Sequence, residues 1–103
     1  MDIVYSINKV PIRLTEERWF HITEGHSEMA GYYYTVLECI EAPNVIYKGI
    51  DEELIAVKEI ENGKFTAVVY KELSDVDGFI ITAFLTKRIN QLERRGKIWE
   101  KQI

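Results

Sequence analysis

The spacing of hydrophobic and polar residues changes along the chain, from a helical period in the first half to an alternating period in the second. Residues 2–7 alternate between the two kinds and predict a short first strand or an extended arm. Thr15 stands at an N-cap position before two glutamates that complement the helix dipole. A first helix is therefore predicted to run from there to about Glu24 and to stop at Gly25.

A second helix is predicted after Ser27, which stands in the position of another cap. Hydrophobic residues then recur at the spacing of a buried stripe, at Met29, Tyr33, Val36, Leu37 and Ile40. Pro43 is expected to end this helix.

The second half of the chain carries strand patterns. Residues 44–48 form one candidate strand. The runs 53–60 and 64–72 flank Glu-Asn-Gly at 61–63, and Asn-Gly between two such runs is a strong hairpin signal. Residues 78–86 are the most apolar run and predict a central strand.

Together these patterns predict a single α+β domain over residues 1–103. Two N-terminal helices would pack on one face of a four-stranded antiparallel sheet, because strands joined by short turns run antiparallel. Residues 87–103 are expected to form a C-terminal basic helix or arm. The opposite face of the sheet would then be free for a ligand.

The composition is that of an ordinary folded protein, since 47% of the 103 residues are hydrophobic and 29% are charged. No apolar run approaches the roughly 20 residues that cross a bilayer, and the first residues do not resemble a signal peptide. Cys39 is the single cysteine, so no disulfide can form within the chain. We therefore expect a cytoplasmic protein without a membrane partner.

Charge is distributed unevenly along the chain. The formal net charge is −4, but residues 87–103 hold six Lys or Arg against two Glu, so this segment carries +4 and the rest −8. Such an asymmetry indicates a basic binding surface. The alternative is a solvated helix with ordinary surface charges.

Two histidines are the first candidates for chemistry. His26 precedes Ser27 and would lie at the start of the second helix, where free N–H groups attract phosphate. An imidazole beside a phosphate is the arrangement that a general base requires, although His26 could instead only bond across a turn. His21 lies within the first helix beside two aromatic residues, where a packed or surface role is expected. The five-residue spacing and the lone cysteine predict no metal site.

Hydroxyl groups line one side of the predicted strand 78–86. By a period of two, Thr82 and Thr86 point the same way as Ile80 and Phe84. The threonines could hold a ligand, or could be present only because threonine favours strands. Tyr70, on the neighbouring strand, is either a core residue or a stacking group.

Two segments carry a family resemblance. Residues 17–31, ERWFHITEGHSEMAG, and 68–88, VVYKE followed by GFIITAFLTKR, resemble the small phage- and mobile-element-associated nuclease-like proteins of the barnase–EndoU–colicin–RelE superfamily. The patterns of that family are close to W-x-H-I, x-R-H-P-E and I-T-A-Y/F-L-T. The resemblance extends over residues 17 to 88, and Gly25 and Ser27 stand where the family usually has arginine and proline.

The resemblance implies a metal-independent ribonuclease without a cofactor, such as a toxin of a toxin–antitoxin or phage-conflict system. The implied catalytic residues are His26, His21, Thr82 and Thr86. The implied substrate-binding residues are Tyr70, Lys87 and Arg88. The partners it implies are RNA and an antitoxin or another protein. The alternative is a catalytically inactive member of the same fold that acts as a protein-binding module.

Overall fold

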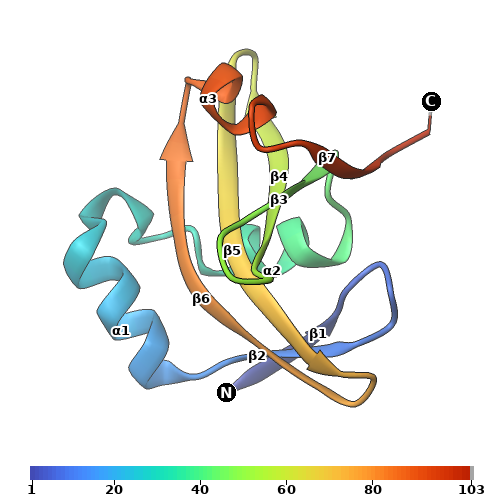
Figure 1. Ribbon diagram of the computed structural model, residues 1–103. Coiled ribbons are helices and arrows are strands. Elements are labelled where there is room, and N and C mark those ends of the chain that lie inside the picture. The colour runs from blue at the N-terminus through green and yellow to red at the C-terminus, as the bar shows by residue number, and fades with distance from the viewer. Residues whose placement is uncertain (103) are drawn as a thin grey trace.

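The computed structural model describes residues 1–102 and contains one seven-stranded sheet, three short α-helices and one turn of 3₁₀ helix (Figure 1). In chain order the elements are β1 (Asp2–Tyr5), β2 (Pro11–Leu14), α1 (Glu16–Gly25), η1 (Ser27–Met29), α2 (Tyr33–Glu41), β3 (Val45–Lys48), β4 (Leu54–Glu61), β5 (Lys64–Ser74), β6 (Asp77–Thr86), α3 (Ile89–Glu93) and β7 (Lys97–Glu100).

The strands lie in the order β1-β2-β6-β5-β4-β3-β7, so the prediction of a four-stranded sheet is wrong. The four strands expected after the helices are β3 to β6, and short strands from both ends of the chain extend the sheet on either side. One of them, β1, lies within the predicted first strand, whereas β2 and β7 have four residues each, which is too short for an alternating pattern to be distinctive. The pairing of β2 with β6 is parallel, whereas all other neighbouring strands are antiparallel.

The predicted hairpin between β4 and β5 is confirmed. Gly63 has a φ of 77° in its turn, a conformation that glycine adopts without a steric cost from Cβ. The N–H of Gly63 donates to the Glu59 carboxylate at 2.9 Å, which fixes the turn.

The first helix forms where the sequence predicts it, and the Thr15 side chain accepts the N–H of Arg18 at 3.1 Å. The predicted continuous second helix is wrong. Only one short turn, η1, follows Ser27, and α2 begins at Tyr33. Gly31 has a φ of 92°, which a right-handed helix cannot include, and the N-cap of η1 is His26, whose side chain makes no capping hydrogen bond.

Both faces of the sheet are covered over part of their area. On the first, here called the helix face, α1, η1 and α2 pack against residues that include Ala56, Val68 and Tyr70. On the second, here called the α3 face, Leu92 of α3 packs in a cluster with Val45, Tyr47, Ile55, Val57 and Ala67. The expectation that helices cover one face and leave the other free is therefore wrong.

The C-terminal segment forms neither a single basic helix nor a free arm. A five-residue helix, α3, is followed by Gly96 at a φ of 93° and then by β7, which pairs with β3. Trp99 lies opposite Ile46 and packs against the core of the helix face. Among the helices of residues 1–102, none combines the length and apolar character that spanning a bilayer requires.

Candidate functional site at the edge of β6

The candidate site lies where β6 has no strand neighbour on one side. The pairing of β2 with β6 extends only over Gly78 and Phe79, so the rest of that edge of β6 is not paired with a strand. Helix α1 runs beside this edge instead (Figure 1), and Arg18 donates to the carbonyl of Ile81 at 3.4 Å. The helix and the turn after it therefore bring residues of the first segment to the second half of β6.

His26 is the residue that this arrangement brings to β6. Its backbone N–H closes α1 by donating to Ile22 at 2.7 Å. Its ring lies 6.0 Å, centroid to centroid, from the ring of Phe84, and Nδ1 lies 3.6 Å from a carboxylate oxygen of Glu28. The side chain is 41% exposed, so the imidazole is in contact with both protein and solvent.

Thr82 and Thr86 lie on either side of Phe84 along the strand, and all three belong to the α3 face. Their partners across the sheet are Val69 and Phe65, which pack against the cluster of that face. The expectation that Ile80 shares this side is wrong, because the register shifts beside Tyr70 and leaves Ile80 buried on the helix face.

The Thr86 hydroxyl is fixed by the chain that follows it. Its oxygen accepts the N–H of Arg88 at 2.9 Å, at the start of α3. A hydroxyl that accepts one hydrogen bond can still donate its own proton, so Thr86 remains able to bind an anion.

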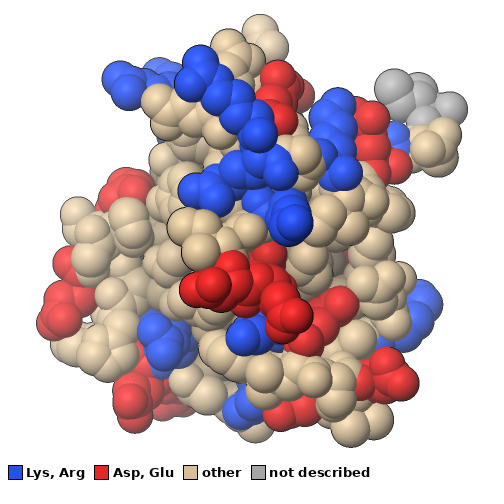
Figure 2. Space-filling view, viewed as in Figure 1, with Lys and Arg blue, Asp and Glu red and all other residues tan. Residues whose placement is uncertain are grey.

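Lys87 and Arg88 are exposed directly after β6, and Arg94 and Arg95 are exposed after α3. Within residues 1–102, no carboxylate lies within 4.0 Å of the charged groups of these four residues. Figure 2 shows Lys and Arg side chains gathered over α3 and the chain after it, with a group of Asp and Glu side chains below them. The basic segment thus forms a cationic surface beside the end of β6.

His21 and Tyr70 do not lie at the site formed by His26 and the second half of β6. His21 is exposed, and its ring packs edge-on against Phe20 at 6.2 Å. Tyr70 is completely buried on the helix face, and its hydroxyl has no hydrogen-bond partner within residues 1–102. Burial, with a smaller contribution from Glu72, raises the pKa of this phenol above 10.0. Tyr70 is thus a core residue that a ligand in solvent cannot reach.

The helix start expected beside His26 is absent. Residues 27–29 form a three-residue turn, which is too short to present the aligned N–H groups that attract phosphate. Anion binding near His26 would therefore depend on the threonine hydroxyls and the nearby cations.

Two residues of the site were not predicted. Glu28 and Phe84 lie against His26, and neither is distinguished by periodicity from an ordinary helix or strand residue.

Cys39 is buried and donates to the carbonyl of Ala56 at 3.4 Å, and burial raises the pKa of its thiol above 9.0. Within residues 1–102, no three His, Cys, Asp or Glu side chains are grouped so that they could hold a metal ion.

Comparisons with models of known protein families, with curated proteins and with solved structures give no match for this chain.

Proposed function

We propose that this protein binds RNA along the α3 face of β6 and cleaves it by acid–base catalysis at His26, without a metal ion. The observation that supports the proposal is the position of the His26 ring, 6.0 Å from Phe84 on the strand that bears Thr82 and Thr86. This strand leads directly into the cationic segment at Lys87.

In the proposed reaction, His26 accepts the proton of a ribose 2′-hydroxyl. The 2′-oxygen then forms a bond to the adjacent phosphorus, and the bond from phosphorus to the 5′-oxygen breaks. The leaving 5′-oxygen takes a proton from the imidazolium or from water. The products are a 2′,3′-cyclic phosphate and a 5′-hydroxyl, so no oxidant and no further reactant is required.

Other side chains would hold the phosphate and stabilise the developing charge. Glu28, 3.6 Å from Nδ1 of His26, stabilises the imidazolium that proton transfer creates. The hydroxyls of Thr82 and Thr86 donate to phosphate oxygens, and Lys87 or Arg88 balances the charge of the transition state.

The cationic surface formed by Lys87, Arg88, Arg94 and Arg95 would bind the RNA backbone. Arg94 and Arg95 have no carboxylate partner within residues 1–102, so their charges are available to a polyanion. Because this binding is electrostatic, it should weaken as the salt concentration rises.

A second candidate function is binding without cleavage. Gly25, the residue before His26, leaves the position next to the imidazole without the guanidinium that the resembling family has there. A site that lacks this cation has one fewer group to stabilise the transition state. In this case the protein would bind RNA or a protein partner and leave RNA intact.

The test is an assay of RNA cleavage in the presence of EDTA. The unaltered protein should cut RNA, and His26→Ala should lower the rate by roughly a hundredfold or more. Ser27→Ala is the matched control, since Ser27 is the exposed neighbour of His26 and its side chain caps no helix. Retention of activity by His26→Ala would contradict the proposed role, and failure of the unaltered protein to cut any RNA would favour binding alone.

A further inference from the structure

We propose that the hollow between β2, the start of α1 and β6 is a phosphate-binding site. The hollow has a volume of about 160 Å³ and is lined by Arg13, Thr15, Arg18, Phe79 and Ile80. It lies where β2 separates from β6 and the chain turns into α1. Two arginines from different elements therefore border one small space.

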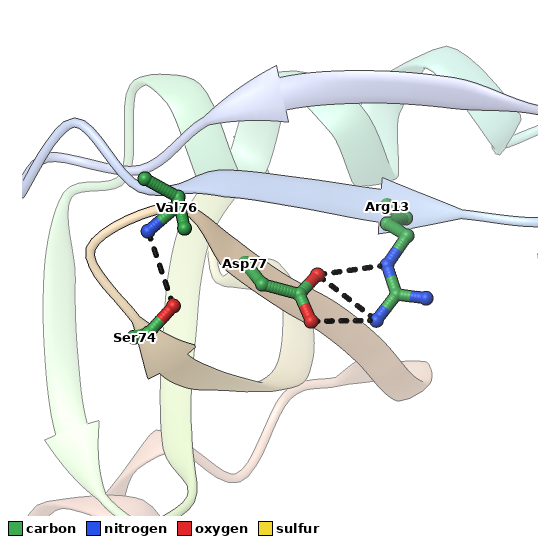
Figure 3. A network of polar contacts seen from close by, with 4 residues as sticks. All are labelled: Arg13, Ser74, Val76 and Asp77. Atoms are coloured by element: carbon green, nitrogen blue, oxygen red, sulfur yellow. Dashed lines mark hydrogen bonds and ion pairs between the residues drawn. The ribbon is translucent and has the colours of Figure 1, made fainter.

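The guanidinium of Arg13 is held in a fixed position. Nε donates to one carboxylate oxygen of Asp77 at 3.1 Å, and Nη2 lies 3.0 and 3.3 Å from the two oxygens. The same group lies over the ring of Phe79, 5.9 Å from its centroid. Its third nitrogen points away from Asp77 (Figure 3) and makes no hydrogen bond within residues 1–102. Arg13 thus offers an ordered donor group that is not yet used.

Arg18 supplies the second cation. Its single hydrogen bond from the side chain, among the residues described, is the long contact of 3.4 Å to the Ile81 carbonyl. No carboxylate oxygen within residues 1–102 lies within 4.0 Å of its guanidinium. The positive charge of Arg18 is therefore not neutralised by a neighbour.

The donors around the hollow fit a phosphate better than a carboxylate. A single guanidinium can satisfy a planar carboxylate with two parallel hydrogen bonds, as Arg13 does with Asp77. Two guanidinium groups together with a hydroxyl can instead bond several oxygens of a tetrahedral anion. Thr15 accepts the N–H of Arg18 at 3.1 Å and can still donate its own proton.

The charges near the hollow permit such a ligand. Arg13 and Asp77 cancel one another, which leaves the charge of Arg18. Glu16 and Glu17 follow in the first turn of α1, but both are exposed, so solvent and salt screen their repulsion. Inorganic phosphate, a phosphorylated small molecule and a nucleic-acid backbone all present the chemical group that the hollow would bind.

This site is separate from the site proposed at His26. Phe84, which contacts His26, lies five positions after Phe79, which lines the hollow, a distance of roughly 17 Å along a strand. Phosphate binding at the hollow can therefore be tested whether or not the protein cleaves RNA.

The experiment is a titration of the ¹⁵N-labelled protein with inorganic phosphate at constant ionic strength, followed by amide chemical shifts. Phosphate should move the amide signals of residues 15–18 and 79–81 and saturate. Arg18→Gln should weaken the binding about tenfold, whereas Lys48→Gln, which removes an exposed cation at the end of β3 and outside both proposed sites, should leave it unchanged.

Two further titrations identify the source of the phosphate. If a short RNA moves the same signals and Arg18→Gln weakens its effect, the site holds the backbone of RNA. If a mononucleotide competes with phosphate and the RNA does not, the site holds a free phosphate compound. The proposal is overturned if phosphate moves none of these signals, or if Arg18→Gln and Lys48→Gln weaken binding equally.

Discussion

The guanidinium of Arg13 and the carboxylate of Asp77 lie 3.0 to 3.3 Å apart although the two residues are separated by 64 positions in the sequence. This ion pair joins β2 to the start of β6, where the two strands pair over only two residues. A second link lies at the same end of the sheet, where Ser6 donates to Glu72 at 2.6 Å. Side-chain contacts therefore help to hold the N-terminal hairpin in the sheet.

Asp77→Asn should lower the free energy of unfolding by about 0.5–1 kcal/mol, measured by urea denaturation. The effect is small because both partners are partly exposed, with side chains 38% and 46% accessible, so solvent screens the attraction. Glu24→Gln is the control, since Glu24 is exposed and has no cation within 4.0 Å among residues 1–102. Equal effects of the two variants would show that the Arg13 ion pair does not stabilise the sheet.

Glu52→Gly should raise the free energy of unfolding by roughly 0.5–1 kcal/mol. Asp51 and Glu52 have φ values of 49° and 69° in the turn between β3 and β4, closed by the N–H of Glu53 on the carbonyl of Ile50 at 3.0 Å. Glycine adopts this left-handed conformation without the steric cost that glutamate has. Glu53→Gly, at a residue without a positive φ, should instead destabilise the protein. A loss of stability in both variants would contradict this account of the turn.

The sequence patterns that predicted elements correctly were either long hydrophobic runs or local signals such as a turn sequence or a helix cap. The run that became β6 and the Asn62–Gly63 hairpin signal are of this kind, as is the Thr15 cap of α1. By contrast, β2 and β7 have four residues each and join the sheet through neighbours that are distant in sequence. Pairing between segments distant in sequence leaves no periodic pattern of hydrophobic residues. The sequence therefore predicts fewer strands than the sheet contains.

For the candidate site, the structure brings together only some of the residues that the sequence predicts, and in surroundings that differ from those predicted. His26 does lie beside the strand of Thr82, although the helix start expected next to it is one short turn. Tyrosine is common both in cores and in binding sites, so the sequence alone leaves the role of Tyr70 open. Its burial beneath the helices shows that it is a core residue. The register shift that separates Ile80 from Thr82 arises from the pairing of β5 with β6, which a period of two does not reveal.

The stability of the protein should fall as the pH rises above about 10. Burial raises the pKa of Tyr70 above 10.0, so in this range the unfolded chain releases the phenol proton while the folded chain keeps it. The folded state then binds more protons, and the free energy of unfolding falls by up to about 1.4 kcal/mol per pH unit from this group. Cys39, whose pKa burial raises from 9.0, adds a loss in the same direction from about pH 9.

The measurement for this prediction is a series of urea denaturation curves across the alkaline range. Tyr70→Phe removes a buried hydroxyl that has no partner, so the variant should fold and should show a smaller loss of stability above about pH 10. An unchanged slope in Tyr70→Phe would mean that the phenol does not contribute to the alkaline loss.

Gly25→Arg should increase RNA cleavage by roughly tenfold or more, because it places a guanidinium beside His26 where charge develops. Nothing lies within 4 Å of a Cβ built at Gly25, so the fold can accept the side chain. Arginine also favours a helix over glycine by roughly 0.5–1 kcal/mol, so the melting temperature should not fall. Gly25→Ala separates the two effects, since it should stabilise the helix without increasing the rate. Equal rates in the arginine and alanine variants would contradict the role of charge.

The proposed cleavage at His26 is tested most directly by the ends of the RNA fragments, compared between an RNA and the same oligonucleotide with a 2′-deoxy residue at the cleaved position. We expect fragments that end in a 2′,3′-cyclic phosphate from the RNA, none from the 2′-deoxy oligonucleotide, and none from either with His26→Ala. Equal cutting of the two oligonucleotides, or identical fragments from the His26→Ala variant, would contradict it.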